Sequence, residues 1–316
     1  AEYASLAEAV LAALWPVVHA EFARKHGHVA GRGAVVLGMG SLGAGRLNAA
    51  SDLDLIVIYD ADTDAQSDGR RPLDARTYYA RLTKAFLTAI SAPTAEGRLY
   101  EVDMRLRPSG RQGPVATSLP AFDTYQQTEA WTWEHLALTR MRHVAGSPDL
   151  AVAVEDVRRR VLAQKSTGPG IRRDVADMRA RLAQAKPAHG LWDAKSGPGR
   201  LMDIELAAQF CALASGYHAR RVEAQLQAGL RAGVIDKPGL DDFLAAYRLC
   251  WNMQATGRLL ADSITDLAAL GETGQRLILR AVEADDADDL ATKLDARSSA
   301  AAARFAALLS NPDPDA

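Results

Sequence analysis

Two aspartates in the first fifth of the chain have the type and spacing of metal-binding carboxylates. Asp52 and Asp54 stand two residues apart at the head of the apolar run 53–59. Side chains alternate between the two faces of a strand, so both carboxylates are expected on one face. Two like charges side by side repel each other, and a bound cation relieves that repulsion. The pair therefore indicates a Mg²⁺ site.

A glycine-rich turn precedes this pair. The turn 38–43, which carries Gly40 and Ser41, follows the apolar run 34–37 and can hold phosphate groups. Its glycines also match the GxGxxG pattern of dinucleotide-binding proteins. That pattern needs a crossover helix, and the eight residues between the turn and Asp52 are too few for one. A phosphate site beside a cation is the better interpretation, with a solvated Asp-x-Asp on an edge strand as the plain alternative.

A third carboxylate lies on a further expected strand, 98–107, where alternation places a polar set on one face. That set comprises Glu101, Asp103, Arg105 and Arg107. We interpret Asp103 as a third ligand that joins the two earlier aspartates around two metal ions. Arg105 and Arg107 then supply cations for a polyphosphate. A salt-bridged outer face of the strand is the alternative.

The elements that must position these residues occupy the first half of the chain. Helical apolar spacing predicts a helix over 4–24, and the runs 34–37 and 53–59 are expected to be short buried strands. Asp74 is expected to N-cap a helix that reaches residue 90. From residue 119 onward helical patterns dominate, with helices expected at 121–144, 148–163, 171–185, 201–215, 218–232, 238–262, 273–283 and 286–308. The sequence thus predicts an α+β fold, with a catalytic domain over 1–147 that includes an N-terminal helix and an all-helical domain over 148–316.

Three weaker features have both a structural and a functional interpretation. Lys195 stands in a glycine-containing turn before an expected helix, where a cation and exposed N–H groups suit phosphate, although an ordinary interhelical turn is equally compatible. Trp131 and Trp133 are expected to be buried against the sheet, with contact to adenine or to an acceptor protein as the alternative. Arginine runs are expected on solvated helix faces, at 158–160, 172–173 and 179–181.

Composition excludes several classes of protein. Of 316 residues, 24% are charged and 48% hydrophobic, which is the profile of a soluble globular protein. The net charge of −2 gives no general attraction to nucleic acid or to an anionic membrane. We see no signal peptide and no apolar span long enough for a membrane helix. Cys211 and Cys250 fit buried free thiols. We therefore expect a cytoplasmic protein without nucleic-acid or membrane partners.

Four longer segments resemble the glutamine synthetase adenylyltransferase family. They are residues 38–55, 100–110, 129–135 and 195–205. The resemblance extends from about residue 30 to 260 and implies a polymerase-β-like nucleotidyltransferase domain followed by a helical bundle. Segment 129–135 and the residues after the third aspartate are similar to the C-terminal, adenylylating half of this two-headed family.

The resemblance also implies residue roles. Asp52 and Asp54 match the family's metal-binding Asp-x-Asp, and Asp103 matches its third carboxylate. Gly40 and Ser41 match the turn that holds the triphosphate. The family usually has lysine at the position of Ser41, so arginines or Mg²⁺ must carry more of the charge neutralisation here.

The activity implied by the resemblance is transfer of AMP from ATP to a tyrosine of glutamine synthetase, with two Mg²⁺ ions and release of pyrophosphate. A PII-type signal protein is implied as a regulatory partner. Phosphorolytic removal of AMP, which can use the same metal site, remains an alternative. A catalytically weak module that binds nucleotide without turnover is the alternative of a different class.

Overall fold

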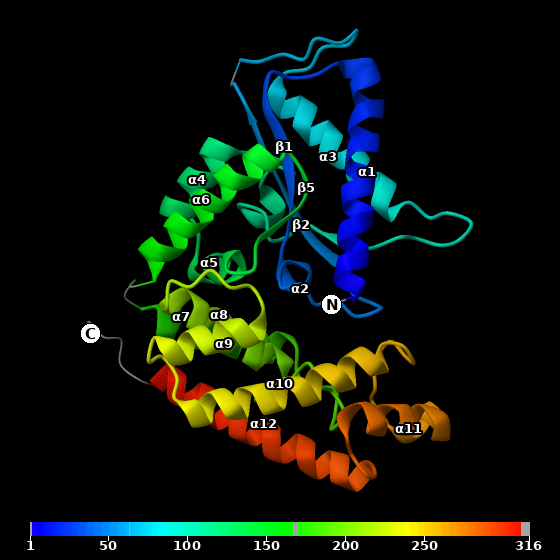
Figure 1. Cartoon of the computed structure of the whole chain (residues 1–316), viewed down its shortest axis with the longest axis vertical. Helices are drawn as coiled ribbons and strands as arrows, with labels where there is room; N and C mark the ends of the chain where they lie inside the picture. The colour runs from blue at the N-terminus through cyan, green and yellow to red at the C-terminus, as the bar shows by residue number, and fades with distance from the viewer. Residues whose placement is uncertain (1, 63, 167, 169, 311–316) are drawn as a thin grey trace. The chain divides into compact units, whose positions relative to one another are not determined.

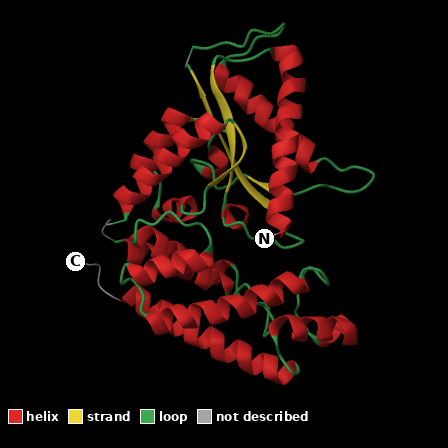
Figure 2. Ribbon diagram, viewed as in Figure 1, coloured by secondary structure: helices red, strands yellow, loops and turns green. Residues whose placement is uncertain are grey.

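The computed structural model of the chain describes residues 2–62, 64–166, 168 and 170–310 (Figure 1). The chain forms two compact units. Unit 1 comprises Ala1–Leu47 and Ser51–Leu162, and unit 2 comprises Asn48–Ala50 and Ala163–Ala316. Unit 1 mixes helices and strands, whereas the elements described in unit 2 are helices (Figure 2). This confirms the α+β class. Along the sequence, the boundary between the units falls after Leu162, within the helix Pro148–Lys165, whereas the predicted domain boundary, 147, lies just before that helix begins.

The sheet of unit 1 contains five strands, which are β1 (Gly31–Gly38), β2 (Leu53–Ala61), β3 (Val102–Asp103), β4 (Thr117–Ser118) and β5 (Arg142–Gly146). Their order is β3-β2-β1-β5, and β4 also pairs with β2. The central strand β1 is antiparallel to β2 and β5, while β3 and β4 run parallel to β2. The apolar runs expected as strands form the two central, buried strands.

Helices flank this sheet. They are α1 (Glu2–His26), α2 (Gly40–Gly43), α3 (Ala75–Ser91), α4 (Leu119–Thr128), α5 (Thr132–Leu138) and α6 (Pro148–Lys165), with a 3₁₀ turn at Gly110–Gln112. Figure 1 shows α1 and α3 together on one side of the sheet. Trp15 of α1 meets Phe86 of α3 edge to face, with ring centroids 5.0 Å apart. Asp74 caps α3 as predicted, because its carboxylate accepts a hydrogen bond from Thr77 N at 2.9 Å.

Two predicted elements are wrong. The single helix expected over 121–144 is instead α4, α5 and the strand β5. The strand expected over 98–107 shrinks to the two residues of β3. The reason is local: the Asp103 carboxylate accepts a hydrogen bond from the Arg105 backbone N–H, which turns the chain away from the sheet. The alternation predicted for that segment therefore ends at Asp103.

Helix α1 is more apolar than the sequence analysis allowed. Among the described residues it is the one helix long and apolar enough to cross a membrane, and 17% of its most apolar window is buried. Its inward positions Ala7, Leu11 and Trp15 nevertheless belong to the core of unit 1. These positions pack α1 on the core, whereas other apolar residues of the helix, such as Leu6 and Val17, are exposed.

Unit 2 contains α7 (Ile171–Ala185), α8 (Leu201–Ala214), α9 (Val222–Arg231), α10 (Lys237–Gly257), α11 (Gly271–Val282) and α12 (Ala287–Ser310), with a 3₁₀ turn at Ala268–Leu270. Cys211 on α8 and Cys250 on α10 are buried free thiols, as predicted, and burial raises the pKa of each to about 12. Gly229 of α9 lets α8 approach closely, because a Cβ there would lie 2.5 Å from Cys211 Sγ.

Candidate functional site

The carboxylate of Asp54 lies directly against the glycine turn. Gly40 begins α2 with φ near +50°, and a Cβ at this position would come within 2.2 Å of Asp54 Oδ2. The backbone joins the same two segments, because Met39 N donates to the Asp54 carbonyl oxygen at 2.9 Å. Only glycine combines this backbone conformation with this approach. The turn and the aspartate thus form one wall of the site.

Strand β3 brings the third carboxylate beside the second. Asp54 of β2 is the register partner of Asp103 of β3 in a parallel pair. Register partners on neighbouring parallel strands project to the same face, about 5 Å apart. The proximity expected between these two aspartates is therefore found. Asp52 is exposed and stands just before β2 begins.

The Arg105 guanidinium pairs with one of these carboxylates, that of Asp103. Arg105 Nε donates to Asp103 Oδ2 at 2.6 Å, and Arg105 N donates to Oδ1 at 2.8 Å. Burial opposes ionisation of Asp103, but these hydrogen bonds outweigh it and hold the pKa of Asp103 below its usual value. Asp103 raises the pKa of Arg105 most strongly, and Asp52 and Asp54 raise it further. Arg105 thus lies within the field of all three carboxylates.

The donor set suits Mg²⁺ in chemical type. Carboxylate oxygens are the protein ligands that this ion prefers, and Asp54 and Asp103 are paired across two strands. Among the residues that the structure describes, however, no group of three or more acidic, histidine or cysteine side chains is gathered closely enough to hold a metal. The ion pair of Arg105 with Asp103 is consistent with this, since the guanidinium already occupies a carboxylate that the ion would need. Three-carboxylate coordination requires these side chains to draw together.

Helix α2 is anchored from β5 by a residue that the sequence analysis missed. Arg142 donates from Nη2 to Leu42 O at 2.8 Å and from Nε to Gly43 O at 3.2 Å, and it pairs with Glu8 of α1. These contacts hold the C-terminal end of the short helix. Ser41 lies in its first turn, where a helix leaves amide groups without intrahelical partners. Sequence reasoning could not find Arg142, because it placed this position in a helix.

Of the other predicted phosphate ligands, Arg107 is committed to its own loop. It donates to the carbonyl oxygens of Met104, Arg111 and Gly113. Burial lowers its pKa. Unit 1 therefore gathers Gly40, Ser41 and Arg105 near the carboxylates, whereas Arg107 stabilises the loop that follows β3. Lys195 belongs to unit 2, in the turn before α8.

The two tryptophans are not buried, so that prediction is wrong. Trp131 is 71% exposed and Trp133 is 37% exposed. The reason is that α5 turns its polar residues inward: Glu134 and His135 are buried, and Glu134 accepts hydrogen bonds from Tyr125 Oη and from Trp131 N. Two aromatic side chains are left on the surface of unit 1.

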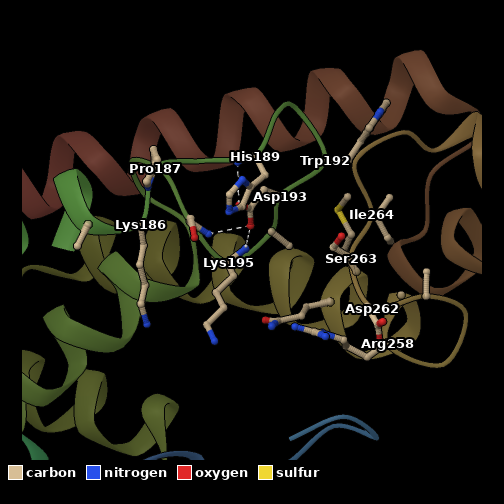
Figure 3. Close-up of a pocket in the computed structure, with 17 residues that line it drawn as sticks. Lys186, Pro187, His189, Trp192, Asp193, Lys195, Arg258, Asp262, Ser263 and Ile264 are labelled. Atoms are coloured by element: carbon tan, nitrogen blue, oxygen red, sulfur yellow. Dashed lines mark hydrogen bonds between the residues drawn. The ribbon is translucent and has the colours of Figure 1, made fainter.

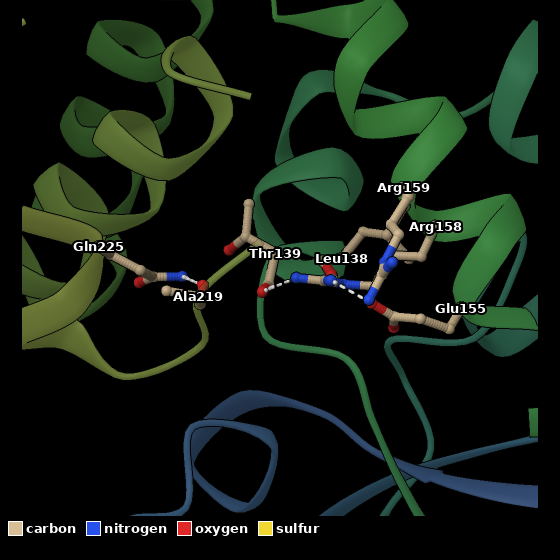
Figure 4. A network of polar contacts seen from close by, with 7 residues as sticks. All are labelled: Leu138, Thr139, Glu155, Arg158, Arg159, Ala219 and Gln225. Carbon is tan, nitrogen blue, oxygen red and sulfur yellow. Dashed lines mark hydrogen bonds and ion pairs between the residues drawn. The ribbon is translucent and has the colours of Figure 1, made fainter. Parts of the chain in front are cut away.

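The prediction of solvated arginine runs is wrong for Arg158. Its side chain is fully buried, and it donates to Leu138 O at 2.8 Å and to Thr139 O at 2.5 Å (Figure 4). These are carbonyls at the C-terminal end of α5, and Glu155 of α6 balances the charge at 3.1 Å. Arg159 is exposed, as expected. Arg158 therefore ties α6 to the end of α5.

The other two runs also include paired arginines. Arg179 is partly buried, donates to Asp203 at 2.6 Å and lies over the Phe305 ring, 5.0 Å from its centroid. Arg172 lies over the Phe210 ring at 5.1 Å. In each run another arginine, Arg173 or Arg181, is exposed as expected.

The chain is similar in sequence to known proteins. The family described as glutamate-ammonia ligase adenylyltransferase matches residues 1–157. Similar proteins are named bifunctional glutamine synthetase adenylyltransferase/adenylyl-removing enzyme. The one from Mesorhizobium japonicum is 45% identical over 78% of this chain and 26% of its own length. Those from Xanthobacter autotrophicus and Agrobacterium fabrum are 41% and 40% identical over 90% and 98% of this chain, and over 29% and 32% of their own lengths.

The chain spans about a third or less of these curated relatives. The match nevertheless covers the whole of the site, because the glycine turn, the three aspartates and Arg105 all lie within residues 1–157. The chain belongs to the glutamate-ammonia ligase (glutamine synthetase) adenylyltransferase family.

Proposed function

We propose that this chain transfers AMP from ATP to a tyrosine hydroxyl of glutamine synthetase and releases pyrophosphate. The observation that carries the proposal is the contact of Asp54 with the glycine turn, next to its register partner Asp103. It unites a place for phosphate with a place for a cation, which is what nucleotidyl transfer requires. The proposed fold of unit 1 is that of a polymerase-β-like nucleotidyltransferase.

Each side chain has a proposed role. Asp52, Asp54 and Asp103 hold two Mg²⁺ ions, which when bound neutralise the triphosphate and the charge that develops on it. The amide groups of Gly40 and Ser41 bind phosphate oxygens, and Ser41 adds a hydroxyl. Arg105 supplies the positive charge that the family's usual lysine would bring at position 41.

In the proposed reaction the tyrosine oxygen attacks the α-phosphorus in line. A bond forms between that oxygen and phosphorus, the bond to the pyrophosphate oxygen breaks, and the hydroxyl proton is lost. Asp103 orients this hydroxyl and accepts its proton. The low pKa of Asp103 in its pair with Arg105 makes it a poor proton acceptor. Release of Arg105 from Asp103 is therefore part of the proposed activation.

The remaining predictions of the sequence analysis form part of this proposal. The chain corresponds to the adenylylating half of a longer, two-headed enzyme, acts in the cytoplasm, and responds to a PII-type signal protein. Unit 2 is the helical domain that serves this control. Arg107 and Lys195 remain predicted phosphate ligands. Phosphorolytic removal of AMP is the alternative that the same carboxylates can support.

Label transfer tests the proposal and separates it from the alternatives. The chain is incubated with Mg²⁺, α-³²P-ATP and unmodified glutamine synthetase, beside an Asp52→Asn/Asp54→Asn variant. Label on the synthetase with the parent and none with the variant supports adenylylation. Phosphate-dependent release of label from modified synthetase, without forward transfer, supports the removal reaction. Nucleotide binding without either reaction supports a binding module.

A further inference from the structure

Unit 2 contains a hollow of about 410 Å³, whose lining includes Lys195, one of the predicted phosphate ligands (Figure 3). One wall is the segment from Lys186 to Ser196, between α7 and α8. The other is the C-terminal end of α10 and the chain that follows it. Met253, Ile264 and Trp192 supply apolar surface. The Ile264 side chain packs tightly on α10, since a Cβ at Gly257 would lie 2.5 Å from its Cδ1. The floor of the hollow is therefore apolar and built from well-packed elements.

The loop that forms the first wall is held in shape by its own aspartate. The Asp193 carboxylate accepts hydrogen bonds from the backbone amides of His189, Lys195 and Ser196, at 2.9 to 3.1 Å (Figure 3). Arg200 adds a hydrogen bond from Nη1 to Gly190 O at 3.2 Å. Burial opposes ionisation of Asp193, but the amide donors outweigh it and lower its pKa. The loop is thus preorganised, and the Asp193 carboxylate stays ionised with its oxygens turned toward the amides of the loop.

Three cationic side chains line the same hollow. Lys186 and Lys195 come from the loop, and Arg258 caps the C-terminal end of α10. Figure 3 shows both lysine side chains extending in the same direction from the loop. No ion pair of these three side chains occurs within the part of the chain that the structure describes. By contrast, the lysines at 237 and 293 are each paired with an aspartate four residues away.

We propose that this hollow is a second ligand site, which binds a small organic phosphate. The apolar floor accepts the flat, carbon-rich part of the ligand, while Lys186, Lys195 and Arg258 bind its phosphate. Two lysines and an arginine supply charged donors for a phosphate group, and arginine can bind it through two parallel hydrogen bonds. The lining also contains two carboxylates, Asp193 and Asp262, so three cations and two anions leave one net positive charge in the hollow.

This inference goes beyond the proposed transfer reaction. The site lies within unit 2 alone and contains none of the three aspartates of unit 1. Lys195, which the sequence predicts to bind phosphate, lines this cavity together with apolar side chains and two further cations. The ligand of this hollow is bound by residues of unit 2, whereas the three aspartates proposed to hold the metal ions belong to unit 1.

Pyridoxal 5′-phosphate is a suitable probe, because it is a flat aromatic phosphate whose aldehyde reacts with lysine. The aldehyde and the lysine amine form an imine with loss of water, and borohydride reduces the imine to a stable secondary amine. Peptide mapping by mass spectrometry then locates the label in the full chain. We expect Lys195 or Lys186 to be labelled at least about ten-fold faster than the exposed Lys84. Pyridoxal, which lacks the phosphate, should show no such preference.

Variants decide whether the hollow binds the phosphate. Arg258→Gln should reduce labelling of the two hollow lysines about ten-fold, as expected when one charge-assisted hydrogen bond is lost. Arg248→Gln, which changes an exposed arginine of the same helix outside the hollow, is the matched control and should have no effect. Circular dichroism confirms that both variants are folded.

Three results on the hollow itself would overturn the proposal, and a fourth concerns unit 1. The three are uniform labelling of the lysines, an equal preference with pyridoxal, and unchanged labelling in folded Arg258→Gln. Loss of labelling in Arg105→Gln would place the bound phosphate at the carboxylates of unit 1 and would also contradict the inference. None of these results depends on whether the chain adenylylates glutamine synthetase, because labelling needs neither Mg²⁺ nor an acceptor protein.

Discussion

Replacement of Gly40 by alanine should abolish most activity while leaving the protein folded. The added Cβ would stand 2.2 Å from Asp54 Oδ2, whereas real Cβ contacts shorter than 3.0 Å are essentially never seen. The Asp54 carboxylate must therefore move by roughly 1 Å, and a displacement of that size can cost about a hundred-fold in rate. The backbone at φ near +50° adds about 1–2 kcal/mol of strain for any residue other than glycine.

Gly33→Ala is the matched control for the backbone term. Gly33 has φ near +83°, and a Cβ there meets nothing within 4 Å. Both variants should lose about 1–2 kcal/mol in free energy of unfolding, measured by urea denaturation. Only Gly40→Ala should lose adenylyl transfer, measured with α-³²P-ATP and glutamine synthetase. Equal activity of the two variants would refute the assignment of Asp54 and the glycine turn to one site.

Three further predictions concern charge, burial and exposure in unit 1. Arg105→Gln should raise the pKa of Asp103 toward its usual value of ~3.9. The stability that the ion pair contributes is present above that pH and is lost as pH falls through the lower pKa of the folded state. The free energies of unfolding of parent and variant, measured by urea titration, should therefore converge in acid. Arg158→Met should lower the free energy of unfolding by about 3 kcal/mol, because two buried carbonyl oxygens lose their donor. The control Arg159→Met should change that free energy by less than about 0.5 kcal/mol. Equal effects of the two substitutions would contradict the role given to Arg158. Trp131→Ala should leave the thermal midpoint within about 2 °C of the parent, since this ring is 71% exposed, and a large drop would show that it packs in solution.

The glycine turn and its aspartates could be predicted because their chemistry is local in sequence. The strand β2 follows directly from the apolar run after Asp52, and its pairing with β1 places Asp54 next to the turn. Gly40 had to be glycine for a reason visible only in three dimensions, namely the approach of the carboxylate. Sequence spacing predicted the members of the proposed site, and strand pairing shows that Asp54 and Asp103 are neighbours.

The errors have a shared physical origin, which is competition between local patterns and tertiary contacts. Residues after α5 have apolar spacing that suits a helix, yet β1 offers an open edge that Arg142–Gly146 fills as β5. The polar alternation after Asp103 suits a strand, but the Asp103 carboxylate captures the Arg105 amide and turns the chain. The sequence around Arg158 predicts an exposed side chain, but α6 packs against the C-terminal end of α5 and buries it there. Sequence patterns within one segment do not show which other segments will contact it.

Single-turnover transfer of labelled AMP, followed as Mg²⁺ is raised, tests the central claim most directly. The parent should modify a tyrosine of glutamine synthetase in a Mg²⁺-dependent reaction. Asp103→Asn, which keeps the side-chain shape but removes the charge, should lose at least about a hundred-fold in rate at every Mg²⁺ concentration, because the charge stabilisation that metal ions supply is worth several kcal/mol. Transfer by this variant at the parental rate would contradict the account, as would a parent that binds ATP and Mg²⁺ but never modifies the synthetase.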